Sequence, residues 1–352
     1  MKTLILPAKD IQQIAQRVGM DELMDEMIRR LEVAFAAFDH GQFRTPARDG
    51  LQYTQPHYGL LEWMPTMENG KLITIKNVGY HPDNPTHHDT STILSTIQSY
   101  DPITGHLVGI MDATFLTALR TGAASAVMSE LLARKNSRCI GLIGTGAQAV
   151  TQLHALSRRF DIEQVLLFDR ETTHAQSFAD RSAFIDAPKQ LADRATILAQ
   201  SDILCTCTSE EPGRGPVLED GEHQPWLHIN AIGSDFIGKT ELPLALLRRS
   251  TTCPDFLAQA NKEGECQQLE DSEIGPGMIE LIKHRERYAE LKEDLTVFDS
   301  TGWSLEDHIG LQMLGDYARE FGLGSEIQIE LDAPDPLDPY SFLQPAELPH
   351  PQ

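Results

Sequence analysis

The stretch IGLIGTGAQA, residues Ile140–Ala149, decides the fold of this 352-residue chain. It follows a short apolar run and opens a segment of helical spacing over 147–160, which places it between a strand and a helix. Gly144, Gly146 and Ala149 form the pattern G-x-G-x-x-A. Glycine there permits a tight turn and lets a pyrophosphate approach the helix N-terminus. The stretch predicts a dinucleotide-binding βαβ unit, and the alternative is a glycine turn in another α/β fold.

An acidic residue supports the first interpretation. The next apolar run, 164–168, ends beside Asp169, 25 residues after Gly144. A carboxylate at that strand end accepts hydrogen bonds from a ribose diol and repels a 2′-phosphate, which favours NAD over NADP. Arg170 is a counter-signal, because a guanidinium beside the acid could bind that phosphate.

The rest of the chain indicates two kinds of structure. Further strands are predicted at 139–143, 202–206, 227–232, 251–255 and 295–299. Alternating strands and helices are typical of a parallel α/β sheet. The N-terminal third is mixed α+β, with a helix over 20–40, strand-like pieces near 58–64, 71–78 and 90–100, a turn at 101–105 and a small-residue helix over 114–133. A helix is expected again at 305–320, and the proline-rich end, 332–352, is expected to be an extended tail. The simplest layout is a dinucleotide-binding domain inserted into a second domain that both chain ends build.

Composition excludes several classes of function. Lys and Arg number 29 and Asp and Glu number 52, for a net charge of −23. That balance argues against nucleic-acid binding and against docking on an anionic membrane. No run of about 18 apolar residues exists to span a bilayer. The start of the chain makes a poor signal peptide. The five cysteines contain no C-x-x-C pair, so reduced thiols and a cytoplasmic location are expected.

Three cations stand in apolar or small-residue surroundings: Arg48, Lys76 and Arg120. A buried cation needs an anionic partner, and a substrate carboxylate or a cofactor pyrophosphate would supply one. Structural salt bridges are the alternative. Asp235 follows a strand at the carboxyl edge of the predicted sheet, where ligands bind in such folds. It is interpreted either as a proton acceptor and donor or as the cap of a turn.

His81, His87 and His88 suggest a metal site, but adjacent histidines point in different directions. No carboxylate or cysteine spacing completes a ligand set, so a surface loop without metal is predicted.

Seven segments together resemble the ornithine cyclodeaminase/mu-crystallin family over nearly the whole chain. They are GLLEWMP (Gly59–Pro65), IKNVGYHPDN (Ile75–Asn84), TALRTGAASAV (Thr117–Val127), IGTGAQ (Ile143–Gln148), HINAIGSDFIGKTEL (His228–Leu242), EGECQQL (Glu263–Leu269) and VFDSTG (Val297–Gly302). GKTEL, the Q-Q-L after EGE and the tail LDAPDPLDPYSFL resemble the bacterial ornithine cyclodeaminases most.

The resemblance implies a Rossmann-type NAD-binding domain, residues 121–317, inserted in a mixed α+β domain of residues 1–120 plus 318–352. The second domain would bind substrate and form a homodimer. The implied substrate-binding residues are Arg48, Glu62, Lys76, Arg120, Asp235 and Thr301. Asp235 is also the implied catalytic acid and base. The family has a Pro-Arg pair where this chain has Pro46-Ala47-Arg48, so Arg44 is the alternative to Arg48.

The implied cofactor contacts are Thr92, Arg120, Gly144, Gly146, Ala147, Gln148, Asp169, Thr208, Asn230, Ala231, Ile232 and Lys239. The implied reaction converts L-ornithine to L-proline and ammonia by transient hydride transfer to bound NAD. Two alternatives share the scaffold. One is an amino-acid dehydrogenase or cyclic ketimine reductase that releases its cofactor, and the other is a ligand-binding protein similar to mu-crystallin. Lysine or another diamino acid is open as the substrate.

Overall fold

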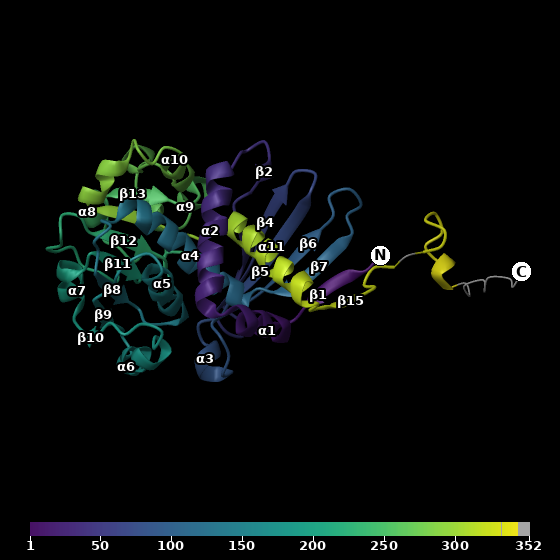
Figure 1. Ribbon diagram of the computed structural model, residues 1–352, viewed down its shortest axis with the longest axis horizontal. Coiled ribbons are helices and arrows are strands. Elements are labelled where there is room, and N and C mark those ends of the chain that lie inside the picture. Colours follow the sequence, from purple (N-terminus) through teal and green to yellow (C-terminus); the bar gives the residue numbers. More distant parts are fainter. Residues whose placement is uncertain (332, 344–352) are drawn as a thin grey trace, which may run out of the picture.

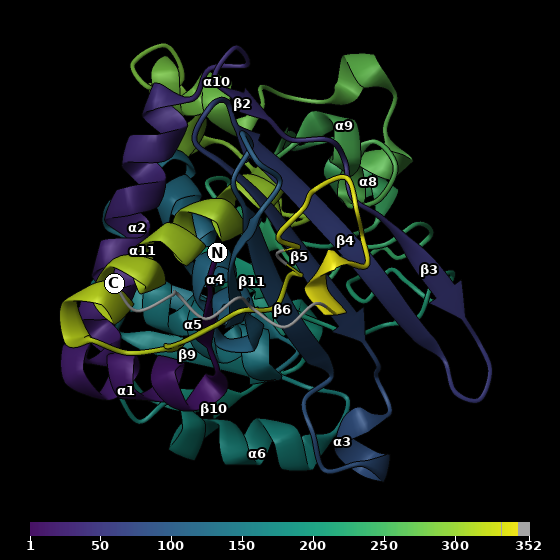
Figure 2. The same ribbon diagram turned by 90° about the vertical axis from the view of Figure 1, so that its right-hand side faces the viewer.

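The computed structural model describes residues 1–331 and 333–343 and contains two sheets separated by helices (Figure 1). The first sheet is largely antiparallel, in the order β15-β1-β7-β6-β5-β4-β2, with β3 also paired to β4. Its strands are β1 (Thr3–Leu6), β2 (Phe43–Arg44), β3 (Asp49–Tyr53), β4 (Gly59–Glu68), β5 (Leu72–Tyr80), β6 (Ile93–Tyr100), β7 (Leu107–Asp112) and β15 (Ser325–Ile327). Figure 2 shows β3 beside β4 at one side of this sheet.

The second sheet is parallel throughout, in the order β10-β9-β8-β11-β12-β14-β13. Its strands are β8 (Cys139–Ile143), β9 (Gln164–Phe168), β10 (Lys189–Leu191), β11 (Ile203–Thr206), β12 (His228–Ala231), β13 (Thr251–Pro254) and β14 (Thr296–Asp299). All six strands predicted for this region form, and the unpredicted β10 extends its edge. This sheet with its helices is the Rossmann-type part of a mixed α/β fold.

Helices cover the sheets and fill the space between them. They are α1 (Ala8–Val18), α2 (Met20–Ala37), α3 (Asn84–His87), α4 (Thr114–Leu132), α5 (Ala147–Ser157), α6 (Thr172–Arg181), α7 (Arg194–Gln200), α8 (Leu244–Leu247), α9 (Leu257–Ala260), α10 (Met278–Lys283) and α11 (Ser304–Phe321). Four short 3-10 turns, η1 (Glu265–Gln268), η2 (Asp271–Glu273), η3 (Ala289–Glu293) and η4 (Ser341–Leu343), complete the elements. None of the helices in the described part of the chain is long and apolar enough to cross a membrane.

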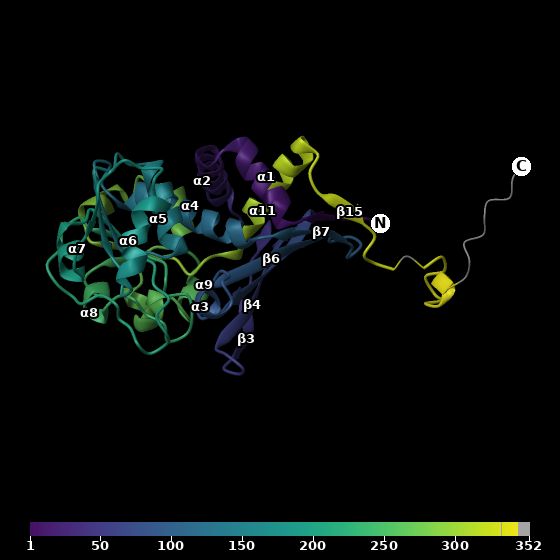
Figure 3. The ribbon, with the colours of Figure 1, turned by 90° about the horizontal axis from the view of Figure 1, so that it is seen from below.

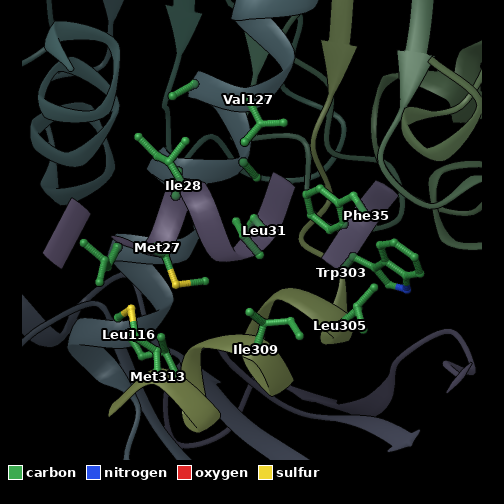
Figure 4. Packing of buried hydrophobic residues seen from close by; sticks show 14 of the residues in the cluster. Met27, Ile28, Leu31, Phe35, Leu116, Val127, Trp303, Leu305, Ile309 and Met313 are labelled. Carbon is green, nitrogen blue, oxygen red and sulfur yellow. The ribbon is translucent and has the colours of Figure 1, made fainter. Parts of the chain in front are cut away.

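The small-residue helix α4 packs against α2, α5 and α11 and reaches strands of both sheets. A Cβ added at Gly122 would lie 2.5 Å from the carbonyl oxygen of Thr151, so glycine is what lets α5 approach this closely. Around α4 lies the main apolar core, to which α2 contributes Met27, Ile28 and Leu31 (Figure 4).

Several predicted boundaries were wrong. The helix predicted to reach His40 ends at Ala37, because Phe38 has an extended ψ of 131°. The strand predicted from Thr90 begins at Ile93. In the tail, 332 and 344–352 lie outside the described residues, and the remainder leads away from the body (Figure 3) with one 3-10 turn, η4, rather than as a fully extended segment. Both predicted domain boundaries fall inside helices, α4 and α11, and the division into domains stays a prediction.

Candidate active site

The carboxyl edge of the parallel sheet has a topological switch point between β8 and β11. From β8 the chain builds β9 and β10 on one side, and then returns to build β11 on the other. In open α/β sheets the loops diverge at such a point and leave a crevice for ligands. The glycine stretch lies here, since it follows β8 and opens α5.

The glycine loop is built for a close approach of the backbone. Gly144 has φ +85°, and a Cβ there would lie 2.6 Å from the carbonyl oxygen of Cys207, the residue that follows β11 by one position. A Cβ added at Gly146 would meet no atom within 4 Å, and both Gly146 and Ala147 are exposed. No side chain caps the N-terminus of α5, so the first amide groups of the helix are free to bind an anion.

Asp169 closes one side of this loop. Its Oδ2 accepts hydrogen bonds from the Thr145 amide at 2.7 Å and the Thr145 hydroxyl at 2.8 Å, and its Oδ1 accepts from the Glu171 amide at 2.9 Å. The carboxylate thus lies at the glycine loop, as the sequence predicts. Arg170 is exposed and its guanidinium is 3.5 Å from the Glu210 carboxylate.

The other side of the crevice is held by Glu241, a fully buried residue that the sequence analysis did not single out. Its carboxylate accepts hydrogen bonds from the Thr208 amide at 2.8 Å, the Thr208 hydroxyl at 2.7 Å and the Gly233 amide at 2.7 Å. It therefore ties the loop after β11 to the loop after β12. The side chain of Asn230 donates to the Ser129 hydroxyl at 2.9 Å, so it packs toward α4.

A second group of residues joins the two sheets at Arg48. The guanidinium Nε lies 2.7 Å from a Glu263 oxygen and 3.3 Å from a Glu62 oxygen, and Nη1 donates to the Thr301 carbonyl at 3.0 Å. Nη2 donates to the Asp235 carbonyl. Arg48 and Glu62 belong to the first sheet region, whereas the other three follow β12, α9 and β14.

Asp235 also contacts Lys239 through its side chain. The Lys239 ammonium lies 2.8 Å from Asp235 Oδ1 and 5.1 Å from the centre of the Tyr80 ring. Burial alone would lower the pKa of Lys239, but Asp235 and Tyr80 outweigh it and raise the pKa above its ordinary value. Lys239 is therefore a permanent cation beside the carboxylate at neutral pH.

Lys76 and Arg120 share one carboxylate in the interior. Lys76 lies 2.8 Å from Asp307 Oδ2, and Arg120 Nε lies 3.2 Å from Asp307 Oδ1. Arg120 Nη1 also lies 2.8 Å from Glu306. All four side chains are at most 5% exposed. Protein carboxylates thus pair with both cations, which is the salt-bridge alternative of the sequence analysis.

The residues around Arg48, Lys76 and Arg120 form one cluster in which burial and neighbouring charges shift the pKa values. Burial, with Arg120 nearby, lowers the pKa of Lys76 to about 8 against the opposing effect of Asp307. Burial raises the pKa of Glu263 to about 7, with Arg48 opposing and Glu62 assisting. Burial also raises the pKa of Glu62, on which Arg48, Asp235 and Lys76 all act. Perturbed titrating groups gathered at one place are typical of functional sites.

Thr301 contributes its backbone to this cluster. Its hydroxyl accepts from Gln259 Nε2 at 2.8 Å and donates to Asp255 at 3.0 Å. Its carbonyl is the group that faces Arg48. The Thr301 hydroxyl is thus occupied by neighbours within the protein.

Arg44 and Thr92, two further residues that the sequence analysis named, lie outside these contacts. Arg44 lies on β2 and is exposed, whereas the Arg48 side chain is 7% exposed and paired, so the geometry favours Arg48 over its alternative. Thr92 is half-buried, and its carbonyl accepts from the His81 amide at 2.8 Å. In the described part of the chain no hydrogen bond joins Thr92 to the glycine loop.

The residues at the sheet edge fit a dinucleotide. The uncapped helix start suits a pyrophosphate, the open space at Gly146 admits it, and the Asp169 carboxylate suits a ribose diol.

Sequence reasoning missed Glu263, Glu306 and Asp307 as members of the cluster. Glu263 stands in a quoted family segment, EGECQQL, to which no role was given. Glu306 and Asp307 are adjacent acids in the first turn of α11, where acidic residues are common in any helix, so the sequence did not set them apart.

Comparison with known proteins defines the class. The family model described as the ornithine cyclodeaminase/mu-crystallin family matches residues 8–321, and the chain belongs to this family. It is 44% identical to L-lysine cyclodeaminase of Streptomyces rapamycinicus over 97% of this chain and all of that protein. It is 29% identical to ornithine cyclodeaminase of Agrobacterium tumefaciens over 94% of this chain and 91% of that protein.

Solved structures agree with the fold. A lysine cyclodeaminase, in a study of recognition of L-lysine, L-ornithine and L-2,4-diaminobutyric acid, has a TM-score of 0.94, 46% identity and coverage of 97% of this chain and 99% of that one. An archaeal alanine dehydrogenase dimer with bound NAD has a TM-score of 0.83, 31% identity and coverage of 94% and 100%. Structural neighbours of this chain thus include NAD(H)-bound members of the family, and its relatives include cyclodeaminases and an alanine dehydrogenase.

Proposed function

We propose that the protein is an NAD-dependent cyclodeaminase of an L-diamino acid, converting it to a cyclic amino acid and ammonia. The observation that carries the proposal is a group of three acidic residues: Glu62 and Glu263 pair with the Arg48 guanidinium, and Asp235 meets Arg48 through its carbonyl and Lys239 through its carboxylate. An amino acid with a second, distal ammonium group needs carboxylates at the far end of its pocket. Alanine has no such group, so these acids favour a cyclodeaminase over an alanine dehydrogenase.

We propose a diamino acid of lysine or ornithine length as the substrate. The lysine cyclodeaminase at 44% identity favours L-lysine, which would yield pipecolate. The GKTEL segment and the tail favour L-ornithine, which would yield L-proline. Both substrates use the same reactive groups and differ by one methylene.

The cations would hold the substrate by exchanging partners. In this chain Arg48 pairs with Glu263, and Lys76 and Arg120 pair with Asp307. A substrate carboxylate entering the cluster would take over one of these ion pairs, which fixes the α-carbon in the crevice. Such positioning contributes about 7–11 kcal/mol to lowering a barrier.

When bound, NAD would supply hydride acceptance and return at the α-carbon, so the overall reaction would have no net redox change. The distal amine must lose a proton before it can attack that carbon. We assign that proton to the Asp235 carboxylate, which would pass it on as ammonia leaves. Lys239, 2.8 Å away, holds the carboxylate in place. The cofactor contacts expected of Thr92, Arg120, Thr208, Asn230, Ala231, Ile232 and Lys239 are part of the same proposal.

Substrate profiling tests the proposal. The purified chain receives a catalytic amount of NAD⁺ and L-lysine, L-ornithine or L-alanine in separate reactions. We expect ammonia and a cyclic amino acid in equal amounts from a diamino acid, and no reaction with alanine. NADH accumulation with alanine would instead support the dehydrogenase alternative.

We also propose a homodimer and a cytoplasmic location. Leu51, Leu61 and Leu94 lie opposite one another on one face of β3, β4 and β6 with Gly79 between the last two, and all three leucines are exposed. An apolar stripe of this kind suits a subunit contact. The five free cysteines suit a reducing compartment.

A further inference from the structure

Three metal-ligating side chains gather outside the candidate active site. His57, Asp83 and His87 are exposed, and each offers one ligand atom that lies within 4.8 Å of the other two. In the described part of the chain no other group of three His, Cys, Asp or Glu side chains meets this distance. We propose that these residues bind a divalent transition-metal ion of the zinc class.

The register of the first sheet brings the two segments together. Strands β3, β4 and β5 are neighbours, with Tyr53 opposite Gly59 and Leu60 opposite Tyr80. The loop 54–58 and the segment 81–87 therefore leave the sheet at the same end. Tyr53 and His81 join the bases of the two segments, with 2.6 Å between the hydroxyl and Nε2. Strand pairing therefore brings the His57 loop and α3 to the same end of the sheet.

Asp83 and His87 are preorganised by the short helix α3. Asp83 precedes the helix with αR dihedrals, and its carbonyl accepts from the His87 amide at 2.9 Å. Side chains four residues apart on a helical turn share one face. His57 completes the set from the other loop, with its ring centre 5.6 Å from that of His87.

The donor set selects the kind of ion. Two imidazoles and one carboxylate suit Zn²⁺ and its neighbours, which take nitrogen and oxygen ligands at about 2.0–2.2 Å. Ca²⁺ and Mg²⁺ prefer oxygen ligands throughout. A cavity of about 130 Å³ is lined by two of the three proposed ligands, His57 and Asp83, and by His88, and it gives room for water beside them.

This inference reverses the sequence prediction, and the reason is specific. The His87 and His88 rings form an edge contact, with centroids 6.4 Å apart and planes at 79°, and of the two only His87 belongs to the group of ligand atoms. The missing partners come from His57, which lies on another loop, and from Asp83, whose spacing to His87 has meaning only once the segment is helical.

Zinc binding to the full chain, without an affinity tag, tests the proposal. Zn²⁺ is titrated against a chromogenic chelator, using the unmodified protein, His57→Gln and His87→Gln. The matched control is His284→Gln, because His284 lies 3.6 Å from Glu280 at the same four-residue spacing and lacks a third ligand among the described residues. Far-UV circular dichroism checks that each exposed substitution leaves the fold intact.

We expect one Zn²⁺ per chain, with binding weakened at least tenfold in His57→Gln and in His87→Gln and unchanged in His284→Gln. Loss of even an outer-shell partner of a metal commonly weakens binding by roughly 10–100-fold, so a direct ligand should matter at least as much. The proposal is overturned if the unmodified chain binds Zn²⁺ no more tightly than His57→Gln, or if His284→Gln weakens binding as much as the other two.

Discussion

The two halves of the candidate site differ in how their charges are met. At the edge of the parallel sheet, the glycine loop is exposed at Gly146 and Ala147, and the helix that it opens has no side-chain cap. In the cluster around Arg48, Lys76 and Arg120, each cation is buried and already paired with a carboxylate of the protein. The first half, which we call the open half, offers unpaired hydrogen-bond donors to an anion. In the second half, which we call the paired half, a ligand has to replace a protein carboxylate in an existing ion pair. It therefore gains affinity there only if it fits the cation as well as that carboxylate does.

Asp235→Asn should give the largest effect, because it removes the proposed proton carrier from the paired half. We expect turnover to fall by about 10²–10⁴-fold, the usual contribution of general acid–base catalysis. NAD affinity, which depends on the open half, should be largely retained. Steady-state kinetics and NADH fluorescence titration measure the two. Asp316→Asn, in a surface ion pair, serves as control, and unchanged turnover in Asp235→Asn would remove Asp235 from the mechanism.

Lys76→Met removes a buried cation while keeping most of its volume. We expect KM for the diamino acid to rise by about 10–100-fold, since hydrogen bonds to charged groups contribute roughly 1.5–3 kcal/mol. NAD affinity should change much less. The control Lys71→Met alters a lysine that is 66% exposed. If KM is unaffected and only stability falls, Lys76 is a structural ion-pair residue, and the paired half does not bind the substrate through it.

Asp169→Ser perturbs the open half. The serine cannot offer a charged acceptor to a ribose diol, and it also loses the two hydrogen bonds from Thr145. We expect NAD affinity to fall by about 10–100-fold and the preference for NAD over NADP to shrink. Binding titrations with both cofactors measure this, with the exposed Asp161→Ser as control. An unaltered preference would contradict the role given to the carboxylate.

Glu263→Gln should give the smallest effect, seen as a change in pH dependence. The folded chain keeps a proton on Glu263 up to a pKa of about 7, whereas the unfolded chain releases it near the ordinary value of 4.5. Between these values the folded state binds more protons, so its free energy of unfolding falls as pH rises.

The contribution of Glu263 is isolated by subtracting the unfolding free energy of the Gln variant from that of the unmodified chain. Urea unfolding at pH 5 and pH 7 should give a difference that declines with pH, on the order of 1–3 kcal/mol across the window. A difference that grows with pH would have the wrong sign.

The same contrast explains what the sequence could predict. The glycine loop and Asp169 lie within one βαβ unit, so local spacing places them together, and all six predicted strands of that sheet formed. The cluster joins residues that are distant in sequence, such as Arg48 and Asp235, 187 positions apart. Their contact depends on packing between two sheets, which periodicity does not encode. The sequence singles out Arg48, Lys76 and Arg120 as cations in apolar or small-residue surroundings, but the carboxylates that pair with them inside the fold required coordinates.

The central claim is that the open half binds NAD next to a substrate that is bound by the paired half. The fate of the α-hydrogen of the substrate tests this claim most directly. The chain is incubated with substoichiometric NAD⁺ and L-lysine or L-ornithine deuterated at the α-carbon, and the products are analysed by mass spectrometry. The account predicts many turnovers per NAD, with deuterium retained at the α-carbon of pipecolate or proline. Deuterium released in stoichiometric NADH, with an uncyclised or unsaturated product, would contradict it.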